Sequence, residues 1–125
     1  MVIPESVRVI SQNAFRGSQL ETITISKYLQ HINAHAFADC SNLASVTIGE
    51  GSHLLSIGTY AFSNTRGISV FNIPASVVAI GTWAFNGWTA SQTINVYEAE
   101  DQYAATAKFG ANWRAGCNAV IKYFE

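Results

Sequence analysis

The residues of this sequence best suited to chemistry lie together in its second quarter. His31, His35 and Asp39 are metal-binding types, and Cys40 with His35 could pair a thiol nucleophile with a base. The histidine and aspartate spacing would suit one face of a helix, but this segment predicts turn and coil, and no cluster of zinc spacing accompanies it. Cys40 also falls in a column of apolar residues, where a small buried filler is the simpler interpretation. We therefore expect no metal and no catalytic residue.

A four-fold repeat indicates the elements that must position these side chains. Each copy has an apolar residue, two spacers, Ile, three spacers and Ala-Phe. The copies are Val7-Ile10-Ala14-Phe15, Leu29-Ile32-Ala36-Phe37, Leu54-Ile57-Ala61-Phe62 and Val77-Ile80-Ala84-Phe85. Their Phe residues are 22, 25 and 23 positions apart, a period typical of a stacked solenoid.

A second apolar set follows each Ala-Phe and ends in alternation, as in Val46-x-Ile48. Alternation of this kind predicts a strand with one buried face. One strand per repeat, near Ile23, Val46, Phe71 and Ile94, should pair in parallel. No segment between the Phe positions is long enough for an ordinary helix, so a coil of stacked turns is favoured over a helix-covered sheet. Gly58 and Gly81 predict tight turns on a second, less regular side.

The repeat resembles the BspA-type leucine-rich repeat, a class of surface proteins. Its phrase is nearly intact in IPESVRVISQNAF, KYLQHINAHAFADCSNLASVTI and IPASVVAIGTWAF, and the resemblance covers about Ile3 to Val96. Departures include two extra residues near Gly49–His53, which should bulge from the third unit. Ser91 stands where Leu is expected, so the core should be looser in the fourth unit.

We thus predict an α/β solenoid, a right-handed leucine-rich-repeat coil with a parallel sheet, four rungs and a C-terminal helix-strand cap. The rungs occupy residues 3–24, 25–47, 48–72 and 73–96 of a repeat region over 1–96, and the cap occupies 97–125. Within the cap, Glu98–Phe109 predicts a helix and Ala119–Tyr123 a last strand. The rung at Ile3–Ile10 has no cap, which suggests the C-terminal piece of a longer protein.

Of the two cysteines, Cys40 lies in the second rung and Cys117 lies beyond the fourth rung, in the predicted cap. Adjacent rungs are about 4.8 Å apart, so the two residues should be separated by at least ~10 Å. A disulfide needs Cα atoms within about 7 Å. We expect two free thiols.

Polar side chains should alternate outward along the four long strands and form what we call the strand face. Resemblance to leucine-rich repeats implies that this concave face binds the ligand, through hydroxyls and amides at fixed spacing. The alternative is that Thr and Asn are there because they suit exposed strands. The strand face comprises Thr22, Thr24, Ser45, Thr47, Val70, Asn72, Thr93 and Asn95.

A second column precedes each Ala-Phe, and we call its members the aromatic ridge: Asn13, His35, Tyr60 and Trp83. Exposed aromatic rings can anchor protein or sugar contacts, which makes His35, Tyr60 and Trp83 the alternative site. The simpler interpretation is that the rings stack only on each other and shield the turn.

The amino-acid composition disfavours some classes of binding partner. Charged residues are 12 % of the chain and the net charge is −1, without a Lys/Arg run, so nucleic acid is disfavoured. No apolar stretch approaches the ~20 residues of a membrane span, so no membrane insertion is expected.

The function expected from these features is a non-enzymatic binding or adhesion module for a protein or glycan ligand, with no cofactor. An extracellular or cell-surface location follows from the resemblance alone. One alternative is a structural stalk or self-assembly unit that stacks through its uncapped N-terminal rung. Another is a fragment of an enzyme whose catalytic domain lies outside these residues.

Overall fold

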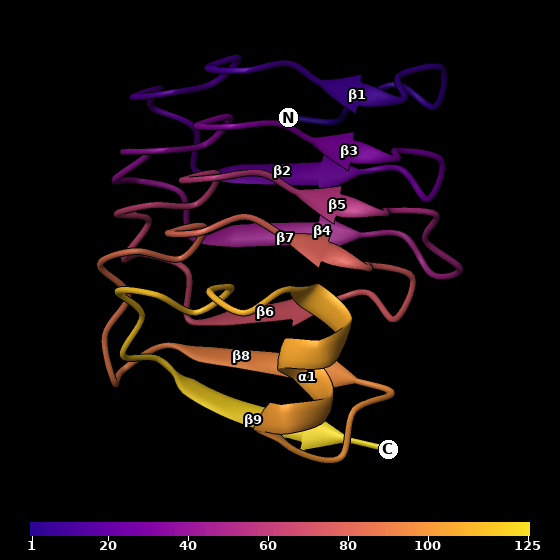
Figure 1. Ribbon diagram of the computed structural model, residues 1–125. Coiled ribbons are helices and arrows are strands. Elements are labelled where there is room, and N and C mark those ends of the chain that lie inside the picture. The colour runs from indigo at the N-terminus through magenta and orange to yellow at the C-terminus, as the bar shows by residue number, and fades with distance from the viewer.

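The computed structural model describes all residues 1–125 and shows a coil of stacked turns, with strands on two sides of the coil (Figure 1). One side is a continuous four-stranded parallel sheet in the order β1-β3-β5-β7. Its strands are β1 (Val9–Ile10), β3 (His31–Ile32), β5 (Ser56–Ile57) and β7 (Ala79–Ile80). Each strand carries the Ile of the repeated phrase, which is buried at all four positions.

The other side carries the five longer strands. They are β2 (Thr22–Ile25), β4 (Ser45–Ile48), β6 (Val70–Ile73), β8 (Thr93–Tyr97) and β9 (Val120–Phe124). All pairings are parallel, as predicted, but they form two sheets, β2-β4 and β6-β8-β9. The expectation of one sheet through all four repeats is therefore wrong at a single point, between β4 and β6.

The C-terminal segment has the predicted helix and strand. Helix α1 (Gln102–Phe109) begins four residues later than predicted, because Glu98 adopts a left-handed φ of 56° and Asp101 caps the helix, its side chain accepting the Ala104 N–H at 2.9 Å. Strand β9 pairs with β8 and adds a fifth turn to the coil (Figure 1). Helix α1 has eight residues, too few to span a membrane.

A column of phenylalanines forms the centre of the core. Ring centroids are 5.4 Å apart for Phe15 and Phe37, 5.2 Å for Phe37 and Phe62, and 6.0 Å for Phe62 and Phe85, with nearly parallel planes. Phe37, Phe62 and Phe85 are fully buried. The column explains the repeat: each aromatic ring must meet its equivalent one turn later.

The fourth rung is not looser than the others, contrary to the expectation drawn from Ser91. Ser91 is exposed, and the neighbouring Gln92 is buried instead. Its Nε2 donates to the carbonyls of Thr65 and Ile68 at 3.0 and 2.9 Å, while its Oε1 accepts the Thr89 N–H at 3.0 Å. A buried amide with its bonds satisfied thus replaces the missing leucine.

The two glycines on the short-strand side serve close approach and have no left-handed φ. A Cβ on Gly58 would lie 2.6 Å from the Ala34 N, and one on Gly81 would lie 2.5 Å from the Thr59 N. The left-handed positions come two residues later, in the aromatic ridge, with φ between 59° and 66°. The predicted turns exist, but crowding between rungs is the reason for glycine.

Candidate binding face

The strand face lies on the longer strands as predicted, with its side chains in two ladders. Thr22 lies opposite Ser45 and Thr24 opposite Thr47 in the first sheet. In the second sheet, the same pairing joins Val70 to Thr93 and Asn72 to Asn95. The six residues on β2, β4 and β6 are exposed, and the two on β8 are half-buried.

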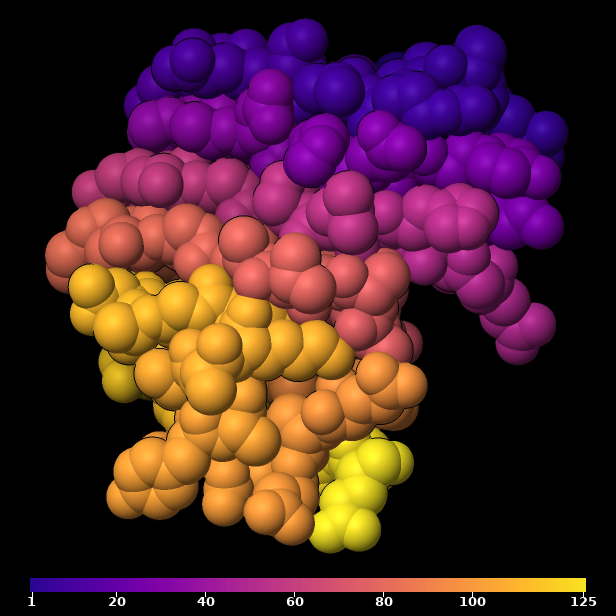
Figure 2. Space-filling view, turned by 45° about the vertical axis from the view of Figure 1, so that its right-hand side comes forward, coloured from indigo at the N-terminus to yellow at the C-terminus, as the bar shows by residue number.

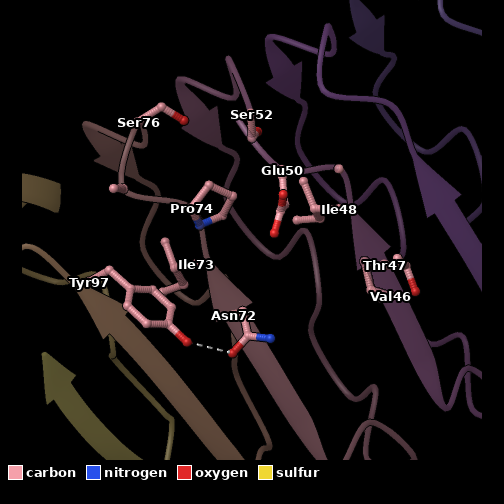
Figure 3. A pocket seen from close by; sticks show the side chains of 13 residues that line it. Val46, Thr47, Ile48, Glu50, Ser52, Asn72, Ile73, Pro74, Ser76 and Tyr97 are labelled. Atoms are coloured by element: carbon pink, nitrogen blue, oxygen red, sulfur yellow. Dashed lines mark hydrogen bonds between the residues drawn. The ribbon is translucent and has the colours of Figure 1, made fainter.

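A polar network holds the second ladder. The Asn95 Nδ2 donates to Asn72 Oδ1 at 2.9 Å, and the Tyr97 hydroxyl donates to the same oxygen at 3.2 Å (Figure 3). The Tyr97 ring stacks on Phe124 with centroids 5.2 Å apart. The Asn72 amide is therefore held in one orientation at the edge of β6.

Strand β4 turns an unpaired edge toward β6. The Gly49 N–H donates to the Ile25 carbonyl at 3.1 Å, so the backbone N–H and C=O groups of the odd-numbered residues of β4 point toward β2. The backbone groups of Val46 and Ile48 consequently point toward β6. No hydrogen bond joins β4 to β6.

Strand β6 mirrors this arrangement. The Thr93 N–H donates to the Ser69 carbonyl at 2.9 Å, which places the backbone groups of Ser69, Phe71 and Ile73 toward β8. The N–H and C=O of Val70 and Asn72 therefore face β4 without a partner there. Two parallel strands present unsatisfied edges to each other.

Two sequence features explain the break. The third unit carries the extra residues of the Gly49–His53 segment, where a turn at Glu50–Gly51 includes a left-handed Gly51 with a φ of 70°. In addition, the equivalent of the Gly49 hydrogen bond one rung on would be donated by Pro74, which has no N–H. The predicted bulge is present, and it opens one side of the coil while the other side remains paired.

The opening is a groove of about 430 Å³, which we call the β4–β6 groove. Val46 and Ile48 are half-buried at the groove, whereas their equivalents Ile23 and Ile25 are buried. In Figure 2 the magenta segment of the third unit projects beyond the stack, and the surface is hollowed below it. The lining residues are Val46, Thr47, Ile48, Gly49, Glu50, Gly51, Ser52, Asn72, Ile73, Pro74, Ala75, Ser76 and Tyr97.

Glu50 is the single charged side chain of the groove. Its carboxylate points into the space between Ile48 and Asn72 (Figure 3), and it makes no ion pair. The one salt bridge of the chain joins Arg16 to Asp39 at 3.8 Å, outside the groove. The groove thus combines free backbone groups, exposed apolar surface and one negative charge.

The aromatic ridge stacks as the sequence predicts. His35 lies 4.9 Å from Tyr60 and Tyr60 lies 6.4 Å from Trp83, ring centroid to centroid, with planes 15° and 16° apart. Trp83 is 40 % exposed, and His35 and Tyr60 are half-buried. The rings mostly cover each other, leaving Trp83 as the accessible end.

The residues considered for catalysis do not form a reactive site. Cys40 is fully buried, and its thiol donates to the Phe15 carbonyl at 2.9 Å. The His31 Nδ1 lies 2.7 Å from Ser56 Oγ, without a carboxylate to complete a triad. No three His, Cys, Asp or Glu side chains form a group that could hold a metal ion.

Both cysteines are free thiols, as predicted. Burial raises the pKa of the Cys117 thiol, although the Ala119 backbone and the Arg114 charge act in the opposite direction. Less thiolate is therefore present at neutral pH than in an exposed cysteine.

Sequence reasoning did not single out Glu50, Pro74 and Tyr97, which line the groove. The signal available was the length of the third unit, since extra residues in one repeat have to leave the rung. It indicated a bulge, but not that the bulge would separate two strands of the sheet.

The coil of parallel strands with Ile and Phe columns defines the chain as a leucine-rich repeat protein, and the comparisons specify its family. The BspA type leucine rich repeat region matches residues 1–103 in six copies. The chain belongs to this family. A comparison with curated proteins finds no match.

Solved structures show the same fold. A leucine rich cell surface protein from Faecalibacterium prausnitzii superposes with a TM-score of 0.72 and 19 % identity over 98 % of this chain and 31 % of that one. A leucine-rich repeat protein from Bacteroides capillosus superposes with a TM-score of 0.60 and 21 % identity, over 97 % of this chain and 75 % of that one. The T. pallidum leucine rich repeat protein superposes with a TM-score of 0.55 and 19 % identity, over 98 % of this chain and 71 % of that one. This chain thus spans about a third of the F. prausnitzii protein.

Proposed function

We propose that the chain is a non-enzymatic binding module of a cell-surface protein, with the strand face as its recognition surface. The observation that carries the proposal is the pair of ladders in register, with six of their eight side chains exposed and the β4–β6 groove between them. Repeated hydroxyls and amides can make many aligned hydrogen bonds with a protein or a glycan. The surface location is supported by the F. prausnitzii relative, which is a cell surface protein.

Immobilised glycans and extracellular matrix proteins, probed with the labelled chain, test this function. Thr47→Lys with Asn72→Lys should abolish binding, because it places two long cations on the strand face. Tyr60→Ala with Trp83→Ala should leave binding intact, provided that both variants retain the far-UV spectrum of the parent. The opposite result would move the site to the aromatic ridge, and a chain that binds no arrayed molecule would refute the proposal.

The alternative function is self-association through the N-terminal rung. The Ile3 N–H donates to the Thr24 carbonyl at 2.9 Å, so residues 1–3 extend the sheet beyond β2, and Val2 is 73 % exposed. A rung of this kind can pair with a second copy. Light scattering after size exclusion distinguishes the two: a concentration-dependent dimer favours assembly, and a monomer at high concentration excludes it.

A further inference from the structure

We infer that the β4–β6 groove binds an extended polypeptide segment carrying a lysine or arginine, by adding a strand to the edge of β4. This inference rests on the proposed function and identifies the ligand class and the point of contact on the strand face. The occupant is specified by three properties of the groove: its free backbone groups, its exposed apolar surface and its charge.

The free backbone groups favour a polypeptide. Val46 and Ile48 direct two N–H and two C=O groups along the groove, at the spacing of a parallel ladder. An extended chain satisfies such a row with its own alternating donors and acceptors, which is how sheets capture peptide strands. The β6 edge is the poorer partner, because its row of donors stops at Pro74.

The apolar surface favours alternation in the bound segment. Val46 and Ile48 are partly exposed only because β6 does not pair with β4. A strand added to β4 points every second side chain toward the interior, where apolar residues would cover both. The volume of about 430 Å³ lies within the usual range for ligand sites.

The negative charge of Glu50 favours a cationic side chain at one position of the bound segment. Glu50 projects into the groove, is exposed and lacks a cationic partner in the chain (Figure 3). A Lys or Arg of the segment would meet this carboxylate near the C-terminal end of β4, while an acidic side chain would be repelled.

The test uses blocked heptapeptides that alternate Val or Ile with Thr or Ser, in a pool with Lys placed at each position in turn. Titration into the ¹⁵N-labelled chain should shift the amide signals of Val46 and Ile48. A matched pool with Glu in place of Lys should bind more weakly. Glu50→Gln should weaken binding of the Lys pool about two- to fivefold, the range for an exposed ion pair. The control Glu21→Gln removes an exposed carboxylate outside the groove and should have no effect.

Three outcomes would overturn the groove assignment: no shift at millimolar peptide, shifts confined to other strands, or equal effects of the two Gln substitutions. Failure of the groove assignment can be told apart from failure of the proposed function. If an arrayed ligand is lost on Thr47→Lys with Asn72→Lys but leaves the Val46 and Ile48 amides unshifted, the strand face binds and the groove does not.

Discussion

At the scale of single residues, buried hydrogen bonds replace apolar contacts where the repeat departs from its pattern. Gln92 spans to carbonyls of the preceding rung, and the Trp88 indole N–H donates to the Phe62 carbonyl at 2.9 Å. The bond to Ile68 satisfies a buried carbonyl that has no other donor. The other two bonds add to carbonyls that also accept from Thr65 or from the Ile68 N–H. Departures from the repeat therefore need not weaken the stack.

Replacing Gln92 tests this directly. Gln92→Leu restores an apolar side chain but leaves the Ile68 carbonyl without a donor and the Thr89 N–H without its acceptor. The Thr65 carbonyl keeps only the longer bond from the Ile68 N–H. We expect a loss of about 1–3 kcal/mol in the free energy of unfolding, the usual cost of unsatisfied buried polar groups. Urea denaturation measures it, with Ser91→Ala as the exposed control that should change stability by less than about 0.5 kcal/mol. A Gln92→Leu variant as stable as the parent would contradict this account.

The cysteines give a second prediction at this scale. Burial raises the pKa of Cys117, so the folded chain holds the thiol proton more tightly than the unfolded chain does. The stability that this preference contributes is fully present below the ordinary cysteine pKa and is lost as the pH rises through the raised pKa. Iodoacetamide should modify both Cys40 and Cys117 slowly in the folded chain, because both side chains are buried, and rapidly in urea. Mass spectrometry follows the reaction, and rapid labelling of the native chain would show that the thiols are accessible.

At the scale of elements, the aromatic column is continuous through the coil, whereas the sheet of long strands is not. The Phe rings stack through all four rungs, whereas the long strands separate between β4 and β6. The extra residues of the third unit are accommodated on one side of the coil, so the core remains packed while one sheet opens. The groove is thus a local consequence of repeat length.

Truncating the Phe column should have equal effects in the last three rungs. Phe37→Ala, Phe62→Ala and Phe85→Ala should each cost about 3–5 kcal/mol, because all three rings are fully buried. Phe15→Ala should cost less, since Phe15 is only half-buried. Urea midpoints measure the series, and a markedly smaller loss for Phe85→Ala would restore the expectation of a loose fourth rung.

Removing the extra residues should close the sheet. Deletion of Glu50 and Gly51 shortens the third unit to the length of its neighbours, which should allow β4 to pair with β6 and protect the Val46 and Asn72 amides from exchange. Hydrogen exchange followed by NMR would detect the new bonds. Unchanged exchange in a folded deletion variant would show that Pro74 or another feature maintains the break.

The repeat made most of the fold predictable, because each column is specified by contacts with its equivalent one turn away. Phe37 and Cys40 could be placed in the core from period alone. The burial of Gln92 could not, since it depends on partners 24 and 27 residues earlier. Nor could the groove, because the path of the bulge through space decides whether Val46 meets Phe71. The residues of the strand face lie beside one another, and so do those of the aromatic ridge, as predicted. That either surface binds a ligand stays a prediction.

At the scale of the whole molecule, the stack presents the strand face on one side, and the C-terminal segment follows the last repeat. We propose that residues 97–125 form a cap on the repeat region 1–96. Trp113 and Phe109 of this segment are buried and meet edge to face, with centroids 5.3 Å apart. Solenoids need such covered ends because the last rung is otherwise apolar.

Truncation after Val96 should therefore expose the end of the stack. We expect the shortened chain to aggregate or to lose its cooperative thermal transition, as followed by circular dichroism and light scattering. A soluble truncated chain that unfolds at the parental temperature would show that the cap contributes nothing to stability.

The central claim is that the strand face is interrupted by an open groove between β4 and β6. Amide hydrogen exchange of the free chain tests it most directly, because exchange reports which N–H groups are bonded. The amides of Val46, Ile48 and Asn72 should exchange rapidly, while those of Gly49 and Thr93, bonded to Ile25 and Ser69, should exchange slowly. Equal protection across all five amides would mean that the sheet is closed and that no groove exists.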